Sequence, residues 1–409
     1  MSKTIVSNIK GGIDFSPKEM LLRNHITDTL RKNFESYGYL PLETASINYL
    51  SLLTHKYDEN AEIVREIYKI RDQGERDLGL RFDLTIPFCK YIALNQNMKL
   101  PFKRYEIGKV WRNGPVKSGR AREFYQCDVD VVGITGVHIE AELISLAVKT
   151  FLELGIEPIV KYNSRHLLPK NDAIVAIIDR LEKVSPEETI KDLCKHMPKV
   201  EAEKLYTDIT QTTKTTDNKE LLDLQIELEK LGVLKYCKYT PSLARGLNVY
   251  TGTVWEIYDK AGRVTCAIGG GGRYDKIIGN FIDNGKEYPA VGTSFGLEPI
   301  TAILNIPPFP KGVTQCPSGE KFSCENLFVS RHSGVFTLPL LMLIPLGTEA
   351  FCQTYADNLR KDGKNVLVYL GGKSMAKAFE YAASYGIRHC AVIGEDEAGG
   401  KPIVIKEIK

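Results

Sequence analysis

The stretch RYEIGKVWRNGPVKSGRAREFYQCDVDVVG, residues 104–133, decides how this chain can fold. Two runs that suit β-strands flank a basic loop with Gly and Pro, residues 113–120, which is the pattern of a long hairpin. Successive side chains of a strand point to opposite faces. The second run therefore alternates Phe124, Gln126, Asp128 and Asp130 with Tyr125, Cys127, Val129 and Val131. We predict a hairpin with one mainly apolar face and one face that holds a ring, an amide and carboxyl groups.

Three arginines, Arg112, Arg120 and Arg122, lie on or beside this loop. A guanidinium group is planar and can bind phosphate through two parallel hydrogen bonds, and an aromatic ring offers a surface for stacking. The hairpin therefore suits a site for a phosphate-rich ligand beside a small cationic or hydrogen-bonding one. An exposed hairpin with solvated charges would have the same periodicity, so periodicity alone leaves both interpretations open.

Composition describes an ordinary chain of 409 residues, long enough for two or three domains with cores of their own. The net charge of +3 means that nucleic-acid binding would depend on local basic patches. The nine cysteines form no Cys-x-x-Cys pair, which favours reduced thiols over disulfides or a structural zinc site. No apolar run is long enough to span a membrane, and the N-terminus lacks a signal-peptide core. We expect a cytoplasmic protein.

Helical and extended patterns alternate over the N-terminal part. Residues 16–37 suit an amphipathic helix that starts at Ser16-Pro17 with Glu19 at its third position, and an extended segment follows from Gly38. We expect strands at 62–70, 81–86 and 157–163, and helices at 87–95 and 136–154, the last ending at Gly155. In the expected strand 81–86, Asp83 and Thr85 share one face, as they would in an ordinary solvated strand.

The remaining chain contains three further regions. Residues 164–234 are mostly helical, rich in Lys, Glu and Leu, and show no arrangement that suggests chemistry. The glycines Gly269–Gly272 stand in a strand context and would let a flat ligand approach the backbone closely. After a linker rich in Pro, Gly and Ser, for which we find no function, strands and helices alternate from residue 340. That alternation predicts a small α/β domain with a largely parallel sheet.

Several segments, in order along the chain, resemble motifs of the histidyl-tRNA synthetases, a family of class II aminoacyl-tRNA synthetases. Residues 104–133 resemble motif 2, and the helix and strand from Ser16 to Glu43 resemble motif 1. Four more segments resemble signatures of the same family: LRFDLTIP (80–87), ARGLNVYTGTVWE (244–256), AIGGGGRYDKI (267–277) and VGTSFGLEPI (291–300).

The resemblance implies an α+β catalytic domain, an antiparallel sheet flanked by helices, made of residues 1–163 and 239–305. It also implies a helical insertion domain at 164–238, a linker at 306–338 and an anticodon-binding-like α/β domain at 339–409, shorter at its C-terminal end than in the family.

The same resemblance implies an enzyme that activates L-histidine with ATP and Mg²⁺ and transfers it to the 3′ end of tRNA(His). In such a reaction a carboxylate attacks the α-phosphate in line, so catalysis is mainly positioning and charge neutralisation. Arg112 and Arg245 would act at the reacting centre, and Arg112, Arg120 and Phe124 would bind ATP. Histidine would be bound by Asp83, Thr85, Gln126, Asp130, Arg245, Tyr250 and Tyr274. We expect no dedicated metal site, no DNA partner, and a homodimer built through motif 1.

The chain departs from the family pattern at a few positions. Pro299 stands where motif 3 normally has the arginine that binds the γ-phosphate, and Ala121 and Val249 each replace a usual tyrosine. Two alternatives therefore stay open beside the synthetase. One is a histidine-binding regulatory relative such as the regulatory subunit of ATP phosphoribosyltransferase. The other is a paralogue that forms the adenylate but does not charge tRNA(His).

Overall fold

The computed structural model describes residues 6–55, 62–116, 121–181, 184–211, 218–245, 249–305, 340–371, 374–385 and 387–408. The linker 306–338, Arg120 and the basic residues Lys117 and Lys373 lie outside these ranges. The chain divides into two compact units, one built mainly from residues 24–303 and one mainly from the C-terminal residues. Each unit is described separately.

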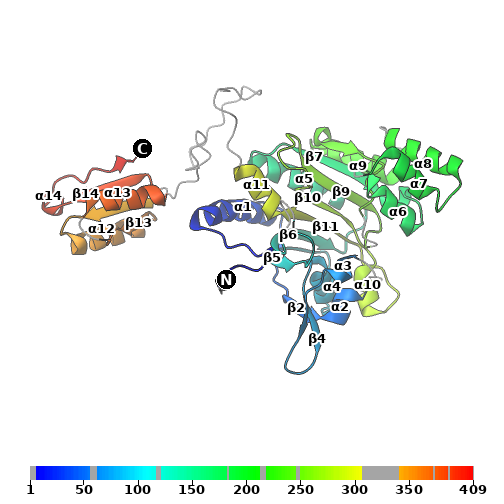
Figure 1. Ribbon diagram of the computed structural model, residues 1–409, viewed down its shortest axis with the longest axis horizontal. Helices are drawn as coiled ribbons and strands as arrows, with labels where there is room; N and C mark the ends of the chain where they lie inside the picture. The colour runs from blue at the N-terminus through cyan, green and yellow to red at the C-terminus, as the bar shows by residue number, and fades with distance from the viewer. Residues whose placement is uncertain are drawn as a thin grey trace, which may run out of the picture. The chain divides into compact units, whose positions relative to one another are not determined.

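The larger unit is organised around an eight-stranded sheet with the order β1-β5-β6-β11-β10-β9-β7-β8 (Figure 1). Its strands are β1 (Leu40–Pro41), β5 (Phe102–Trp111), β6 (Glu123–Val132), β7 (Pro158–Ser164), β8 (Cys237–Tyr239), β9 (Thr253–Asp259), β10 (Gly269–Arg273) and β11 (Ala290–Gly296). The strands from β5 to β7 pair antiparallel, whereas the short edge strands β1 and β8 pair in parallel with β5 and β7. The α+β fold is confirmed, with parallel pairing at both edges as the added detail.

The predicted hairpin is formed by β5 and β6, which pair from Phe102 opposite Val132 to Trp111 opposite Glu123. On β6 the predicted alternation holds. Cys127, with no exposed surface, lies opposite Phe295 of β11, while Asp128 and Asp130 lie opposite Ser294 and Gly292. The apolar set and the polar set therefore belong to opposite faces of the same sheet.

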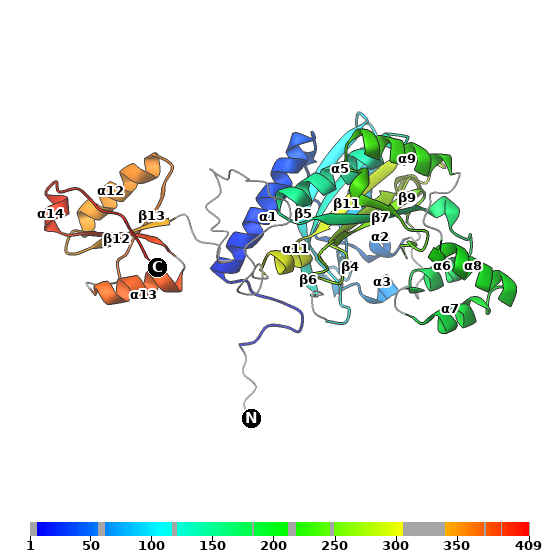
Figure 2. The same ribbon diagram turned by 90° about the horizontal axis from the view of Figure 1, so that it is seen from above.

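Helices α1 (Pro17–Ser36) and α5 (His138–Glu153) cover the apolar face and lie side by side (Figure 2). Phe34 and Phe151 both contact Phe295, with ring centroids 5.4 and 5.3 Å away, and all three are fully buried. The predicted start of α1 is confirmed, because the backbone N–H and hydroxyl of Ser16 both donate to Glu19, which closes a capping box. Gly155, at φ +74°, ends α5 in the left-handed conformation expected of a C-cap.

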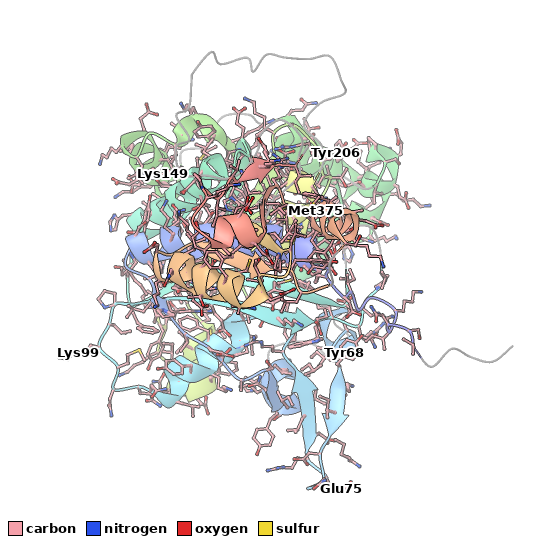
Figure 3. All side chains as sticks on the ribbon, turned by 90° about the vertical axis from the view of Figure 1, so that its left-hand side faces the viewer. Tyr68, Glu75, Lys99, Lys149, Tyr206 and Met375 are labelled. Carbon is pink, nitrogen blue, oxygen red and sulfur yellow. The ribbon has the colours of Figure 1, made fainter. Side chains whose placement is uncertain are left out.

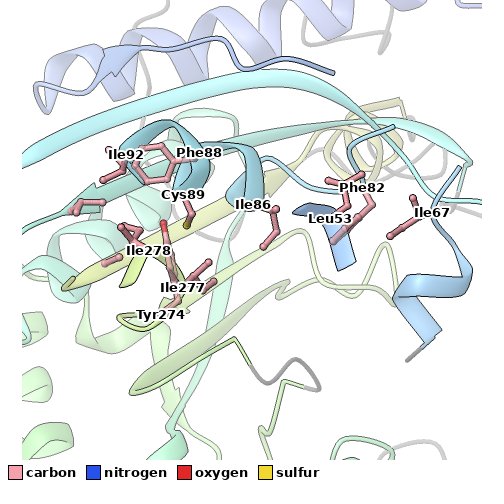
Figure 4. Close-up of a cluster of buried hydrophobic side chains, with 12 residues drawn as sticks. Leu53, Ile67, Phe82, Ile86, Phe88, Cys89, Ile92, Tyr274, Ile277 and Ile278 are labelled. Atoms are coloured by element: carbon pink, nitrogen blue, oxygen red, sulfur yellow. The ribbon is translucent and has the colours of Figure 1, made fainter. Parts of the chain in front are cut away.

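Helices α4 (Thr85–Leu94) and α10 (Ile277–Ile282) pack together on the polar side of the sheet. Their buried side chains form a cluster that includes Tyr274 and reaches Val132 and Ala290 at the strand ends (Figure 4). The cluster continues through Leu53 into α2 (Leu50–Thr54). Helix α2 contacts a three-stranded sheet with the order β2-β4-β3, whose strands are β2 (Ile47–Tyr49), β3 (Lys69–Arg71) and β4 (Asp77–Leu80). The turn of the β3–β4 hairpin, with Glu75 at its tip, projects away from the rest of this unit (Figure 3).

Two strand predictions are wrong. Residues 62–70 contain helix α3 (Glu62–Arg65) and only the first two residues of the short strand β3. Residues 81–86 are not a strand, because β4 ends at Leu80 and α4 begins at Thr85, two residues before the expected start. The side chain of Asp83 accepts a hydrogen bond from the backbone N–H of Ile86 (3.1 Å). Proline is tolerated at position 87, in the first turn of α4, because a backbone N–H there would have no partner within the helix. Asp-Leu-Thr-Ile-Pro is thus a helix start that resembles an alternating strand.

The helices of residues 164–234 are confirmed in the described part. After the short turn η1 (Arg165–Leu167), α6 (Asp172–Ile178), α7 (Pro186–Leu193) and α8 (Lys199–Gln211) enclose a small core of their own. Helix α9 (Lys219–Lys230), which Asn218 caps through the N–H of Leu221 (3.1 Å), packs against α5, and the turn η3 (Leu234–Tyr236) leads into β8. In Figure 1, α6, α7 and α8 gather at one end of the sheet while α9 runs along α5.

The C-terminal unit is the predicted α/β domain. Its sheet has the order β13-β12-β14-β15, and β12 (Leu340–Pro345) pairs in parallel with β13 (Asn365–Val368) and β14 (His389–Ile393). Helix α12 (Glu349–Lys361) packs on one face and α13 (Met375–Ser384) on the other, each over a separate apolar core. The last strand, β15 (Lys406–Glu407), pairs antiparallel with β14, and a short helix α14 (Glu395–Ala398) precedes it. Among the described residues, no helix combines the length and the apolar character that crossing a membrane requires.

Candidate active site

Glycines make the polar face of the sheet unusually flat. Gly108 of β5, Gly270 and Gly272 of β10, and Gly292 of β11 all lie on this face. A Cβ atom at Gly270 would stand 2.7 Å from the guanidinium of Arg245, and one at Gly272 would stand 2.6 Å from the ring of Tyr250. The missing side chains therefore let functional groups from other segments lie directly on the strands.

Buried ion pairs connect β5 and β6 on this face. Arg104 contacts Asp130 at 2.7 Å and Glu106 at 3.4 Å, and Arg81 contacts the other oxygen of Glu106 at 2.6 Å. The guanidinium of Arg104 also donates to the carbonyl of Leu84 (3.1 Å) and lies over the Phe88 ring. A buried charge is costly unless it is paired, so these contacts fix the position of the Asp130 carboxylate. Its second oxygen accepts a short hydrogen bond from the hydroxyl of Tyr274.

The buried Asp128 and Asp130 and the half-buried Asp83 form a cluster of carboxyl groups. Burial raises the pKa of Asp83 to about 6, and the charge of Asp130 adds to this effect while Arg112 and Arg104 oppose it. Burial, followed by the charge of Asp130, raises the pKa of Asp128 to about 8. The pKa of Asp130 is also raised by burial, although Arg104 and the Tyr274 hydroxyl favour its ionised form. The cluster is therefore able to hold a proton near neutral pH and to attract a cation.

Arg112 leaves the end of β5 toward the carboxyl cluster. Its Nε donates to the carbonyl of Phe82 (2.9 Å), and its guanidinium carbon lies 5.2 Å from the centroid of the Phe124 ring. Because Arg112 lowers the pKa of Asp83, the two charged groups influence each other directly. The planar guanidinium carries several N–H donors in a fixed fork, which suits a ligand with more than one acceptor oxygen.

Gln126 lies on the same strand face between Phe124 and Asp128. Its amide nitrogen donates to the hydroxyl of Ser294 (3.3 Å), while its buried amide oxygen has no hydrogen-bond partner within the described residues. A buried acceptor without a partner is costly, and a donor group of a bound ligand would satisfy it. Thr85, at the first position of α4, follows Asp83 by two residues.

Arg245 and Tyr250 reach the site from the segment that precedes β9. The Arg245 guanidinium donates to the carbonyls of Trp255 (3.2 Å) and Gly271 (3.4 Å), lies 3.7 Å from Glu256 and stands over the Tyr250 ring. Burial raises the pKa of Tyr250, which Asp128 and Asp130 raise further and Arg245 opposes. Tyr250 therefore shares one electrostatic environment with the carboxyl cluster, more than 100 residues away in the sequence.

The segment with Pro299 is compatible with the fold. Helix α11 (Leu297–Asn305) begins directly after β11, and Glu298 accepts hydrogen bonds from the backbone N–H of Tyr125 (3.2 and 3.3 Å), which ties this segment to β6. Pro299 is buried in the first turn of α11, where its missing N–H costs nothing. Proline therefore keeps the helix start but supplies no charge.

The structure brings most of the predicted site residues together over one face of the sheet. Asp83, Arg112, Phe124, Gln126, Asp130, Arg245, Tyr250 and Tyr274 converge there, whereas Arg120 lies outside the described residues. Sequence reasoning missed Arg104, Glu106 and Asp128 as site residues, although Arg104 and Glu106 alternate onto the same strand face as Gly108. In the described part of the chain, no group of three or more His, Cys, Asp or Glu side chains could hold a metal ion.

Comparisons with known proteins agree with this geometry. The family described as "Histidyl-tRNA synthetase" matches residues 11–161 and 170–300, and the family described as "Anticodon binding domain" matches residues 341–409. "Histidine--tRNA ligase 1" of Bacillus cereus (strain ATCC 10987 / NRS 248) is 39% identical over 432 residues, covering 99% of this chain and 93% of that protein. "Histidine--tRNA ligase 2" of Shouchella clausii is 34% identical, covering 100% of this chain and 97% of that protein. Histidyl-tRNA synthetase from Nostoc sp. PCC 7120 has a similar structure, with a TM-score of 0.80, 26% identity, and coverage of 99% and 95%.

Proposed function

The chain belongs to the histidyl-tRNA synthetase family, and we propose on that basis that the polar face of its large sheet is where it activates histidine before charging tRNA. Family membership makes the chain a ligase that joins histidine to tRNA. The regulatory and non-charging alternatives are not favoured, because the curated ligases match nearly the full length of the chain.

One observation carries the assignment of the site: two guanidinium groups stand on either side of the carboxyl cluster. Arg112 follows β5, Arg245 lies over β10 and β9, and the carboxyl groups of β6 lie between them in the order of the strands. In the reaction, a carboxylate oxygen of histidine attacks the α-phosphate of ATP and pyrophosphate leaves. Negative charge concentrates between the reactants, and fixed guanidinium groups stabilise it without reorganisation.

The ATP side of the site would lie at the open end of the β5–β6 hairpin. Arg112 would bind the α-phosphate, Arg120 the distal phosphates, and Phe124 would stack on adenine, supported by the guanidinium of Arg112 over its ring. Mg²⁺ would arrive bound to the phosphates, since Mg²⁺ commonly uses substrate phosphates and water as ligands. Its chemistry there is to neutralise phosphate charge.

The histidine side would use the carboxyl cluster. Asp83 and Thr85 with Gln126 would hold the α-ammonium group, which a carboxylate and an amide oxygen attract. Asp130, Tyr250 and Tyr274 would contact the imidazole, and Arg245 would hold the reacting carboxylate. A pocket that pairs both ring nitrogens rejects analogues that lack them by roughly 10⁴-fold.

The partners and domain boundaries follow from the same proposal. Residues 1–163 and 239–305 would form the catalytic domain, 164–238 the insertion over the acceptor arm, and 339–409 the domain that binds the anticodon of tRNA(His), after a linker at 306–338. Exposed lysines of that domain, Lys361, Lys364 and Lys377, would contact phosphates. A homodimer would cover Leu40 of β1 and Ile47 and Tyr49 of β2, which expose 59, 50 and 58% of their surface. Because tRNA charging needs tRNA and ATP, we place the enzyme in the cytoplasm.

The test is histidine-dependent exchange of labelled pyrophosphate into ATP, run beside charging of tRNA(His). We expect both activities, with exchange absent when histidine is replaced by other amino acids. Exchange without charging would overturn the tRNA part of the proposal. Histidine binding without exchange would overturn the activation part and favour a regulatory protein.

A further inference from the structure

The carboxylate of Glu220, on helix α9, contacts two strands of the large sheet. Glu220 accepts hydrogen bonds from the hydroxyls of Ser164 (2.9 Å) and Thr253 (2.8 Å), and its side chain contacts Nδ1 of His166 at 3.0 Å. Ser164 ends β7 and Thr253 begins β9, so the carboxylate joins two neighbouring strands to α9. Three polar contacts on one carboxylate are more than a solvated helix residue requires.

Both ends of the segment 241–253, of which the structure describes 241–245 and 249–253, are bonded close to Glu220. The buried amide of Asn163 donates to the carbonyls of Pro241 (2.9 Å) and Leu243 (3.0 Å), and the backbone N–H of Arg165 donates to the carbonyl of Gly252 (2.9 Å). A Cβ atom at Gly252 would stand 3.2 Å from the Glu220 carboxylate, so Glu220 packs closely against this backbone.

This segment carries Arg245 and Tyr250, two of the residues assigned to the site. Arg245 has φ +37°, a left-handed backbone conformation that residues other than glycine rarely adopt and that persists only where the surroundings fix it. The segment therefore needs anchors, and its anchors converge at the end of β7 and the start of β9.

We infer that Glu220 is a positioning residue for histidine activation: through it, helix α9 holds the segment on which Arg245 and Tyr250 lie. The inference rests on the proposed function, since it concerns the histidine side of that site. The helical region would then support histidine activation, in addition to its proposed place over the acceptor arm of tRNA. Arg112 and Phe124, on the ATP side, belong to the β5–β6 hairpin, which β11 and β10 separate from β9 in the order of the sheet.

The anchor depends on a charged carboxylate. Burial alone would raise the pKa of Glu220, but the bonds from His166, Thr253 and Ser164 outweigh it and lower the pKa below its usual range. Glutamine at this position has one acceptor oxygen and an NH₂ group, so it cannot accept all three bonds. Hydrogen bonds to a charged group contribute more than neutral ones.

The test compares Glu220→Gln with Glu227→Gln in the full-length protein. Glu227 lies on the same helix and pairs with Lys230 (2.8 Å), so it controls for a lost charge on α9. We expect Glu220→Gln to lower kcat/KM for histidine in pyrophosphate exchange by about tenfold, the loss of one charged hydrogen bond. The KM for ATP and the melting temperature of the variant should stay near those of Glu227→Gln.

Thr253→Val removes the same contact from the sheet side and should give a similar loss. In the double variant the two losses should not add, because each removes one interaction. Equal changes in the KM for histidine and for ATP, together with a lowered melting temperature, would show a merely structural role and overturn the inference. Unchanged kcat/KM in Glu220→Gln and in Thr253→Val would also overturn it. Absence of exchange in the unmodified protein would instead overturn the proposed function.

Discussion

The two faces of the large sheet are made from the same strands but differ in what they bury. One face packs Phe34, Phe151 and Phe295 against one another under α1 and α5. The other face buries Arg104, Glu106, Asp128 and Asp130, with glycines between them. Apolar burial stabilises the fold by roughly 25 cal/mol per Å², whereas a buried ion pair seldom returns more than its desolvation cost. The first face therefore holds the protein together, and the second is built for its ligands at some expense in stability.

Matched substitutions of phenylalanine should separate the two faces most clearly. Phe295→Ala removes a fully buried ring and should lower the free energy of unfolding by about 3–5 kcal/mol, while the KM for histidine and for ATP stays the same. Phe124→Ala, on the polar face, should cost less stability and raise the KM for ATP by roughly tenfold, the loss of one stacking contact. Urea unfolding and pyrophosphate exchange measure both variants. An increase in the KM for ATP in Phe295→Ala would remove the distinction.

Two positive side chains at the end of β5, one toward each face of the sheet, make a second comparison. Arg112→Ala should lower kcat of pyrophosphate exchange by roughly 10²–10³-fold, because a fixed donor near the transferred phosphate is lost. Lys109→Ala, on the apolar side of the same strand and paired with Glu123 at 2.6 Å, should leave kcat near that of the unmodified enzyme. Similar losses in both variants would indicate a general effect of positive charge on ATP binding.

Glycine at position 292 tests the flatness of the polar face. A Cβ atom there would overlap the carboxylate of Asp130, so Gly292→Ala should displace that group and lower kcat/KM for histidine by about 10²-fold. Val291→Ala, one residue earlier on the opposite face, should lower stability without changing the KM for histidine. Steady-state exchange at varied histidine gives both values, and an unaffected Gly292→Ala enzyme would show that Asp130 does not bind histidine.

The contrast between the faces was available from sequence, because residues 124–131 alternate with period two and the register of a hairpin follows from its strands. The helix of residues 16–37 was equally accessible through its capping signals. Asp83 and Thr85 were placed on a strand because a helix start and an alternating strand look alike over five residues. Their participation in the site was expected only through family resemblance.

Other parts of the site depend on contacts that no local pattern contains. Arg104 and Glu106 look like solvated charges of an edge strand, and only the pairing with β6 and the approach of Arg81 bury them. The convergence of Tyr250 with Asp130, and the anchor at Glu220, join segments far apart in the chain. Such contacts arise from the fold as a whole, so periodicity could not predict them.

Asp128 provides the smallest and most specific test of the polar face. Its pKa, raised to about 8, lies above the value of about 3.9 for a carboxyl in an unfolded chain, so between these values the folded protein holds a proton that the unfolded chain has released. Its contribution to the free energy of unfolding should therefore fall as pH rises, by up to about 1.4 kcal/mol per pH unit, and level off above about pH 8. Asp83 titrates near pH 6 and adds little to the slope above pH 7.

Asp128→Asn cannot ionise, so urea unfolding of both proteins from pH 7 to pH 9 isolates this effect. The stability of the asparagine variant relative to the unmodified enzyme should increase from pH 7 to 8 and then stay constant. A difference that does not change with pH would mean that Asp128 is already ionised at pH 7, stabilised by Arg104 and Ser294 despite its burial. In that case the polar face would carry one more negative charge at neutral pH, and attraction of the histidine ammonium group would rest on three carboxylates instead of two.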